Sequence, residues 1–146
     1  MSSITVLIAD HDEARRAACA RLLQPEKGIR VVGRAKSGLE TLSATAKLKP
    51  RILLLGLNLL KRKKIGLIYA LRQKSRRTKV ILLTHHTPET RILEALSYGA
   101  RGYLEERALR TFLVEAVRRV DAREAWMPRK MVARIIERLP RLTACG

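Results

Sequence analysis

The sequence predicts an α/β protein with a doubly wound, five-stranded parallel sheet. Short apolar segments alternate five times with helical segments of about 10–15 residues, which is the pattern of consecutive βα units. The apolar segments are continuously hydrophobic, so the strands are expected to be buried on both faces by layers of helices. The chain has 146 residues, which is long enough for one such domain around a full core.

The first strand is expected at Ile4–Ala9, a β-branched apolar run that ends at polar residues. A helix follows over 13–23, where small and apolar residues recur at helical spacing and arginines take the other face. Pro88 suits the first turn of a later helix, and Gly99 suits the left-handed position after its end. The remaining strands are expected at 29–34, 51–55, 79–83 and 101–104, and the remaining helices at 38–49, 66–75, 88–98 and 109–122.

Residues 1–122 therefore form the predicted domain, and residues 123–146 form a C-terminal helical extension or linker. An amphipathic helix is expected over 128–139, because apolar residues such as Met131 and Ile135 recur on one face. The sequence leaves three interpretations of this helix open. It packs back on the domain, pairs with another chain, or links to a further segment.

Lysine and arginine are in large excess, since 31 of them against 13 acidic residues give a formal net charge of +18 at pH 7. Such an excess favours polyanionic partners. Aromatic residues make up only 3%, which leaves little material for stacking single-stranded bases. Cys19 and Cys145 lie at opposite ends, which excludes a disulfide scaffold and favours a reducing, cytoplasmic compartment. No apolar run approaches the roughly 20 residues of a membrane span, so no membrane partner is expected.

The positive charge is concentrated in one part of the chain. Between Glu40 and Glu89 there is no acidic residue in 48 positions, whereas lysine and arginine total 12. Three interpretations stay open: contacts to nucleic acid phosphates, docking of an acidic protein, or a solvated basic face. The sequence has no helix-turn-helix or zinc-finger pattern, so contacts to nucleic acid would be nonspecific. The candidate polyanion-binding residues are Lys61, Arg62, Lys63, Lys64, Arg72, Lys74, Arg76, Arg77 and Lys79.

Polar residues follow four of the predicted strands at their carboxyl ends. In doubly wound folds the ligand crevice lies beyond these ends, so the residues there are the candidates for function. They are Asp10, His11 and Asp12 after the first strand, Gly56 and Asn58 after the third, Thr84, His85 and His86 after the fourth, and Glu105 and Glu106 after the fifth.

Four segments around these strand ends resemble one known family, namely residues 6–10, 53–58, 80–84 and 99–104. Over residues 4–122 the chain is similar to the CheY-like receiver domain of two-component response regulators, especially the kind that precedes a LuxR/NarL-type DNA-binding domain. The resemblance implies a flavodoxin-like strand order of 2-1-3-4-5 and a function in signal transduction and transcription regulation. It also implies a phosphorylation site at the carboxyl edge, with Mg²⁺ held by carboxylates.

Carried over to this sequence, the resemblance implies that the phosphorylation chemistry is lost. The phospho-acceptor position falls on Gly56, which has no side chain to phosphorylate, and the lysine position falls on Glu106, which reverses the charge. The acidic pair falls on Asp10 and His11, with Asp12 one position too late, so Mg²⁺ binding is expected to be weak or lost. Asp10 is then either a residual cation ligand or an ion-pair partner. The chain is interpreted as a degenerate pseudo-receiver without catalytic residues, metal or cofactor.

Thr84 and Tyr103 match the family's switch and phosphate contacts. Each also has a second interpretation, because a threonine at a strand end commonly satisfies backbone groups and a tyrosine on a strand commonly packs against the sheet. A metal site at this edge is a further hypothesis, which would require His11, His85 and His86 to come together.

The leading functional hypothesis is a regulatory module that acts through protein–protein contacts without phosphorylation. By resemblance, a protein partner or a second copy would bind the face formed by residues 91–98, 101–104 and 109–120. The first alternative is a nucleic-acid-associated transcriptional regulator, or the receiver part of a longer LuxR-type DNA-binding protein. A second alternative is residual phosphotransfer on Asp10 or Asp12.

Overall fold

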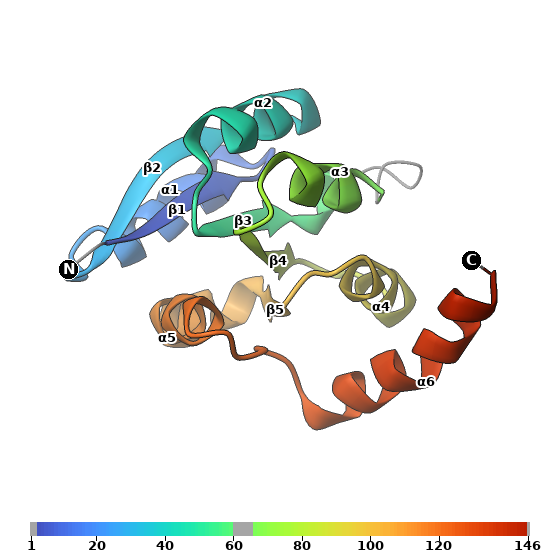
Figure 1. Ribbon diagram of the computed structural model, residues 1–146. Coiled ribbons are helices and arrows are strands. Elements are labelled where there is room, and N and C mark those ends of the chain that lie inside the picture. The colour runs from blue at the N-terminus through green and yellow to red at the C-terminus, as the bar shows by residue number, and fades with distance from the viewer. Residues whose placement is uncertain (1–2, 60–65, 146) are drawn as a thin grey trace.

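A parallel sheet lies between two layers of helices in the computed structural model, which describes residues 3–59 and 66–145 (Figure 1). In this part of the chain the sheet has five strands in the order β2-β1-β3-β4-β5, and neighbouring strands pair in parallel. The predicted fold class and strand order are therefore confirmed. The strands are β1 (Ile4–Ala9), β2 (Ile29–Ala35), β3 (Ile52–Gly56), β4 (Lys79–Thr84) and β5 (Gly102–Glu105).

Helices α1 and α5 cover one face of the sheet, and α2, α3 and α4 cover the other (Figure 1). Asp12 begins α1 by accepting a hydrogen bond from the Arg15 amide, and Ser37 begins α2 by accepting one from the Glu40 amide. None of the helices among the described residues is long and apolar enough to cross a membrane. The helices are α1 (Glu13–Leu23), α2 (Gly38–Leu48), α3 (Leu67–Lys74), α4 (Glu89–Ser97), α5 (Leu109–Asp121) and α6 (Arg129–Cys145), with short 3-10 turns at Leu57–Leu59 and Glu106–Ala108.

Successive residues of the central strands face opposite layers of helices. Leu7 and Leu53 pack toward α2, α3 and α4, whereas Ile8 and Leu54 pack toward α1 and α5, and all four are fully buried. Strands covered on both faces need apolar residues at consecutive positions, which explains their continuously hydrophobic sequences. The central strands β1, β3 and β4 therefore carry no charged side chain between their ends.

The segment that follows α5 returns to the edge of β5. Trp126 forms a parallel bridge with Gly102, in which the Trp126 amide donates to the Arg101 carbonyl at 3.0 Å. The Tyr103 amide donates in turn to the Trp126 carbonyl at 3.1 Å, and the Trp126 ring lies 5.9 Å from the ring of Phe112. These contacts satisfy backbone groups that an edge strand would otherwise leave open to pairing with another chain.

Helix α6 then packs against α4. Met131 is fully buried in the layer formed by α2, α3 and α4, and Arg134 forms an ion pair with Glu89 at the start of α4. Of the three interpretations of the extension, the structure therefore shows that it packs back on the domain. The helix spans Arg129–Cys145 and so ends six residues beyond the predicted limit of 139, whereas the other elements begin and end within one residue of prediction.

Replacing Gly102 by alanine is expected to lower the free energy of unfolding by about 1–3 kcal/mol, because overpacking displaces the bridge. A Cβ atom at Gly102 would lie 2.5 Å from the Trp126 carbonyl oxygen and 2.9 Å from its Cβ atom. Urea unfolding measures the loss, with the fluorescence of Trp126, the single tryptophan, as the signal. Gly66→Ala is the matched control, since a Cβ atom there meets nothing within 4 Å. Equal stability of the two variants would contradict the prediction.

Candidate functional site

The predicted site residues come together at the carboxyl edge of the sheet. Asp10 directly follows β1, Gly56 ends β3, Thr84 ends β4 and Glu106 follows β5. These strands are neighbours in parallel register, so their ends lie side by side. The structure brings Asp10, Gly56, Thr84 and Glu106 to this one edge, and the contacts of each side chain determine what the edge can do.

A buried ion pair occupies the centre of this edge. Arg15 donates from Nε to Asp10 Oδ2 at 2.7 Å and from Nη2 to Asp10 Oδ1 at 3.2 Å. Asp10 is fully buried and Arg15 is only 7% exposed. The hydrogen bond to Asp10 raises the pKa of the Arg15 guanidinium, which therefore stays protonated. Of the two interpretations of Asp10, the structure therefore shows the ion-pair partner.

Three further titratable side chains lie beside this ion pair. Arg15 Nη1 lies 3.5 Å from Glu106 Oε2, and the same carboxylate oxygen lies 2.5 Å from His85 Nδ1. On the other side, His11 Nδ1 lies 3.6 Å from Asp10 Oδ1. Arg15 thus stands between two carboxylates, and Glu106 has a cation beside it even though it replaces a lysine in the resemblance. The sequence analysis did not identify Arg15 as a site residue. Its position five residues after Asp10, in the first turn of α1, was the one indication of a contact with that carboxylate.

Gly56 leaves no room for a side chain at the end of β3. A Cβ atom built on Gly56 would lie 2.6 Å from Asp10 Oδ2 and 2.7 Å from Asp10 Cγ, which is closer than real Cβ contacts. The Asp10 carboxylate, held by Arg15, therefore fills the space where a side chain on β3 would begin.

The side chains of Thr84, Asp12 and Tyr103 each bind to the backbone or pack against the core. The Thr84 hydroxyl donates to the Leu104 carbonyl at 3.3 Å and is buried. The Asp12 carboxylate accepts from the Arg15 amide at 3.2 Å, and this hydrogen bond lowers the pKa of Asp12. Tyr103 packs half-buried against the core, and burial raises the pKa of its hydroxyl. These contacts match the second interpretation that the sequence left open for Thr84 and Tyr103.

A family model described as the response regulator receiver domain matches residues 6–118, which include β2 to β5 and most of β1. The chain belongs to this family. Receiver domains are signalling modules of two-component systems, so the resemblance noted in the sequence is confirmed.

Individual relatives support the same assignment. The response regulator UvrY of Escherichia coli (strain K12) is 33% identical over 120 residues, which are 80% of this chain and 54% of UvrY. GacA of Pseudomonas protegens is 32% identical over 139 residues, which are 91% of this chain and 62% of GacA. The chain therefore spans between about half and two thirds of the length of these relatives.

Solved structures share the fold of this receiver domain. The signal receiver domain of NarL from Mycobacterium tuberculosis aligns with a TM-score of 0.75 at 25% identity, over 84% of this chain and 98% of that one. A LuxR-family response regulator from Aurantimonas aligns with a TM-score of 0.79 at 24% identity, over 93% and 97% of the two chains.

The residues at the carboxyl edge do not fit Mg²⁺, the ion that the receiver resemblance implies. Mg²⁺ requires oxygen ligands in octahedral geometry. Both oxygens of Asp10 already accept hydrogen bonds from Arg15, and Gly56 offers no side-chain oxygen. A guanidinium therefore holds the carboxylate that a cation would need.

The hypothesis of a histidine metal site is wrong. The rings of His85 and His86 lie 4.3 Å apart, but His85 faces Glu106 while His11 lies beside Asp10. Within residues 3–59 and 66–145, no three side chains of His, Cys, Asp or Glu are grouped so that they could hold a metal ion. The turn after β4 places His86 in a left-handed backbone conformation, with a φ of 49°.

The described candidates for polyanion binding lie at the amino edge of the sheet. Lys61, Arg62, Lys63 and Lys64 lie outside the described residues. Arg72, Arg76, Arg77 and Lys79 line a cavity at the opposite, amino edge of the sheet, and Lys74 lines a neighbouring cavity with Arg76 and Arg77. Three further cations of the first cavity were missed, namely Arg51, Arg101 and Arg123. One indication of them was present in the sequence, because Arg51 and Arg101 each directly precede a strand and so lie at the amino edge of the sheet.

Cys19 is expected to resist alkylation in the folded protein. It is fully buried on α1, and burial raises the pKa of its thiol from 9.0 to about 12. The neutral thiol therefore contributes stability that is complete below pH 9 and declines between pH 9 and 12, as the unfolded chain ionises first. Peptide mass analysis after iodoacetamide treatment at neutral pH tests this, with the same treatment in urea as the control. Rapid native-state alkylation of Cys19 would contradict its burial.

Proposed function

We propose that this receiver domain signals through protein–protein contacts without being phosphorylated, and that it is a pseudo-receiver rather than an enzyme. The observation that supports this most directly is the buried Asp10–Arg15 pair beneath Gly56. By the resemblance, Gly56 takes the phospho-acceptor position, and glycine offers no atom to phosphorylate. Arg15 supplies internally the positive charge that Mg²⁺ would bring, so the acidic position is neutralised in every state of the protein.

Incubation with acetyl phosphate and Mg²⁺ tests the absence of phosphorylation. We expect the intact mass of the protein to stay unchanged, because Gly56 lacks an acceptor and Asp10 is buried against Arg15. A receiver domain that accepts phosphate from the same donor serves as the reaction control. A mass increase of one phosphoryl group, mapped to Asp10 or Asp12, would overturn the proposal and establish residual phosphotransfer.

The proposed partner surface is the face formed by α4, β5 and α5, as the resemblance suggests. Helix α6 and Trp126 cover the α4 side and the β5 edge, so the contact would be made chiefly from the α5 side. There Phe112 is 41% exposed. A second copy of the chain is the simplest occupant, because receiver domains pair through this face in the resemblance.

Light scattering during size exclusion tests self-association in the absence of phosphodonor and Mg²⁺. We expect a dimer that Phe112→Ser weakens, while Leu39→Ser has no effect because Leu39 is 80% exposed on α2, at the other end of the sheet. A monomer at high concentration that also captures no protein partner would overturn this part of the proposal.

The second candidate function is a nucleic-acid-associated transcriptional regulator, or the receiver part of a longer DNA-binding regulator. Two observations favour it: the net charge of +18, and a 27% identical relative named transcriptional regulatory protein DegU, of Brevibacillus brevis. Fluorescence anisotropy with a random-sequence duplex over a salt series tests direct contact. Affinity that falls steeply with salt would favour this candidate, since phosphate contacts release counterions. No binding at low salt would rule out direct nucleic acid contact by this chain.

A further inference from the structure

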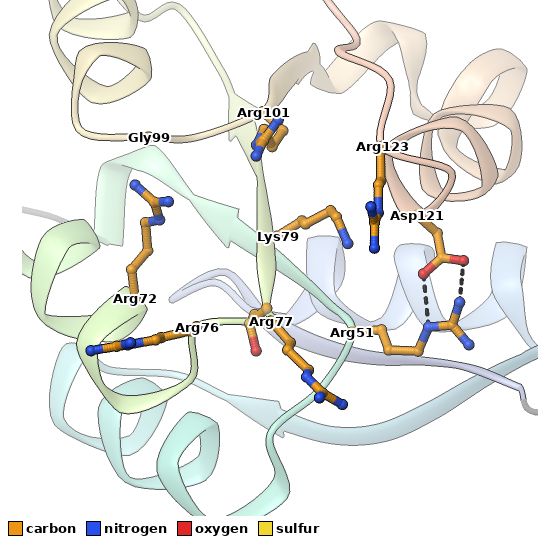
Figure 2. A pocket seen from close by; sticks show the side chains of 10 residues that line it. Arg51, Arg72, Arg76, Arg77, Lys79, Gly99, Arg101, Asp121 and Arg123 are labelled. Atoms are coloured by element: carbon orange, nitrogen blue, oxygen red, sulfur yellow. Dashed lines mark hydrogen bonds and ion pairs between the residues drawn. The ribbon is translucent and has the colours of Figure 1, made fainter.

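A strongly basic cavity lies at the amino edge of the sheet, away from the Asp10 site (Figure 2). Its volume is about 680 Å³, which falls within the range of roughly 300–1,000 Å³ typical of small-molecule sites. Seven cationic side chains and one carboxylate line it. The sheet is parallel, so this edge is the one where the strands begin, and nothing in the proposed signalling function uses it.

Three of the cations are fixed by the sheet itself. Arg51 precedes β3, Lys79 begins β4 and Arg101 precedes β5, and these strands are neighbours in that order. The Lys79 amide donates to the Arg51 carbonyl at 3.0 Å, and the Arg101 amide donates to the Val80 carbonyl at 2.8 Å. Adjacent strands lie about 4.8 Å apart, so the backbone holds three positive side chains within a short distance before any ligand arrives.

The cavity contains far more positive than negative charge. Its carboxylate, Asp121, is already engaged with Arg51 through hydrogen bonds of 2.6 and 2.8 Å. Figure 2 shows Lys79 and Arg123 reaching into the space beside this pair. Among the described residues, no carboxylate lies within ion-pair distance of Lys79, Arg101 or Arg123. Like charges held together repel one another, so an anion would be attracted strongly to this space.

The backbone at Arg123 carries a second, independent sign of function. Arg123 follows the end of α5 with a φ of 71°, and its amide donates to the Val120 carbonyl while the Glu124 amide donates to the Arg119 carbonyl. This is the helix-ending arrangement in which glycine is the usual left-handed residue. An arginine there adopts a disfavoured conformation, and its side chain lines the cavity.

We propose that this cavity binds a compact oligophosphate, meaning a short run of linked phosphate groups that is either inorganic or carried by a nucleotide. Guanidinium groups donate two parallel hydrogen bonds to phosphate oxygens, and five or more of them can share several phosphates. A single phosphate would leave most of these cations uncompensated. Among the described residues that line the cavity there is no aromatic side chain, so a nucleobase would find no stacking surface there and recognition would rest on the phosphates.

Isothermal titration of the whole chain with sodium tripolyphosphate tests the proposal. We expect one site per chain and an affinity at least about tenfold tighter than that for orthophosphate, because the linked phosphates engage several cations at once. Titration with ATP separates the two sources. Tighter binding of ATP than of tripolyphosphate would indicate a nucleotide-borne ligand, and equal or weaker binding of ATP would indicate an inorganic one. Either result supports an oligophosphate site.

Two variants locate the site. Arg101→Ala is expected to weaken tripolyphosphate binding about tenfold, the effect of losing one charge-assisted contact. Arg123→Gly is expected to weaken it similarly without a lower melting temperature, since glycine adopts the left-handed backbone freely. Arg30→Ala, on the exposed surface of β2, is the matched control and should leave binding unchanged.

Two outcomes would overturn the proposal. Binding of several anions per chain, weakened as much by Arg30→Ala as by Arg101→Ala, would show nonspecific attraction to a basic surface. Binding of a random duplex that both pocket variants weaken, without tripolyphosphate binding, would show a nucleic acid surface instead. Because neither Asp10 nor Arg15 lines the cavity, failure here leaves the phosphorylation-independent function untouched.

Discussion

Arg15→Ala is expected to destabilise the protein by about 3–5 kcal/mol, because it leaves a buried carboxylate without its partner. Asp10 is fully buried, and Arg15 supplies two of its hydrogen bonds. The Asp12 amide, 3.0 Å from Asp10 Oδ1, is too weak a donor to replace a guanidinium. Urea unfolding at neutral pH measures the loss.

The double variant Asp10→Asn, Arg15→Leu serves as the control for this result. It removes both charges and keeps apolar volume, so it should lose less stability than Arg15→Ala alone. If Arg15→Ala has nearly the stability of the unmodified protein, water must solvate Asp10. The pair would then not replace a bound cation.

Gly56→Asp is expected to destabilise the protein by about 3 kcal/mol or more, and it should not restore phosphorylation. The new Cβ atom would fall within 2.6 Å of the Asp10 carboxylate. A second carboxylate beside Asp10 also adds like charge to a buried site. The Asp10–Arg15 pair must move to make room, and its loss is the main energetic cost. Urea unfolding measures the stability, and intact mass after acetyl phosphate treatment measures the chemistry.

Gly56→Ala separates the steric cost from the electrostatic one. It introduces the same Cβ contact without a charge and should cost about 1–3 kcal/mol, the usual range for overpacking. If Gly56→Asp instead folds as stably as Gly56→Ala and accepts a phosphoryl group, the glycine alone blocks the chemistry. Arg15 would then have no part in preventing phosphorylation.

The fold could be predicted because the residues within or beside each helix and strand favour that element. Continuous apolar runs such as 52–55 require burial on both faces, and Asp12 and Ser37 cap the helices that follow them. The extension was harder to predict, because its apolar face, which repeats from Met131 to Leu139, fits packing on the domain or on another chain equally well. Contacts between distant segments decide between them, namely the bridge of Trp126 to β5, the burial of Met131 and the ion pair of Arg134 with Glu89.

The candidate site was predictable in position but not in its contacts. Strand ends such as Asp10 and Glu106 meet because parallel strands end at one edge. The helix pattern could not predict that the Arg15 side chain points into the protein, because that pattern places arginines on the solvent face. The amino-edge cavity could not be predicted for a similar reason. Arg51, Arg101 and Arg123 are far apart in sequence, and only the fold of the sheet brings them to one cavity.

The bridge between Trp126 and Gly102 bears on where the folded domain ends along the chain. The family model ends at residue 118, yet Trp126 completes the hydrogen bonding of β5 and Met131 fills the helical layer beside α4. A chain truncated after 118 or 122 would keep every family motif and still lose part of its core. The segment that the family model matches is thus shorter than the segment that packs around one core. Domain fusions or grafts should therefore be joined beyond Met131.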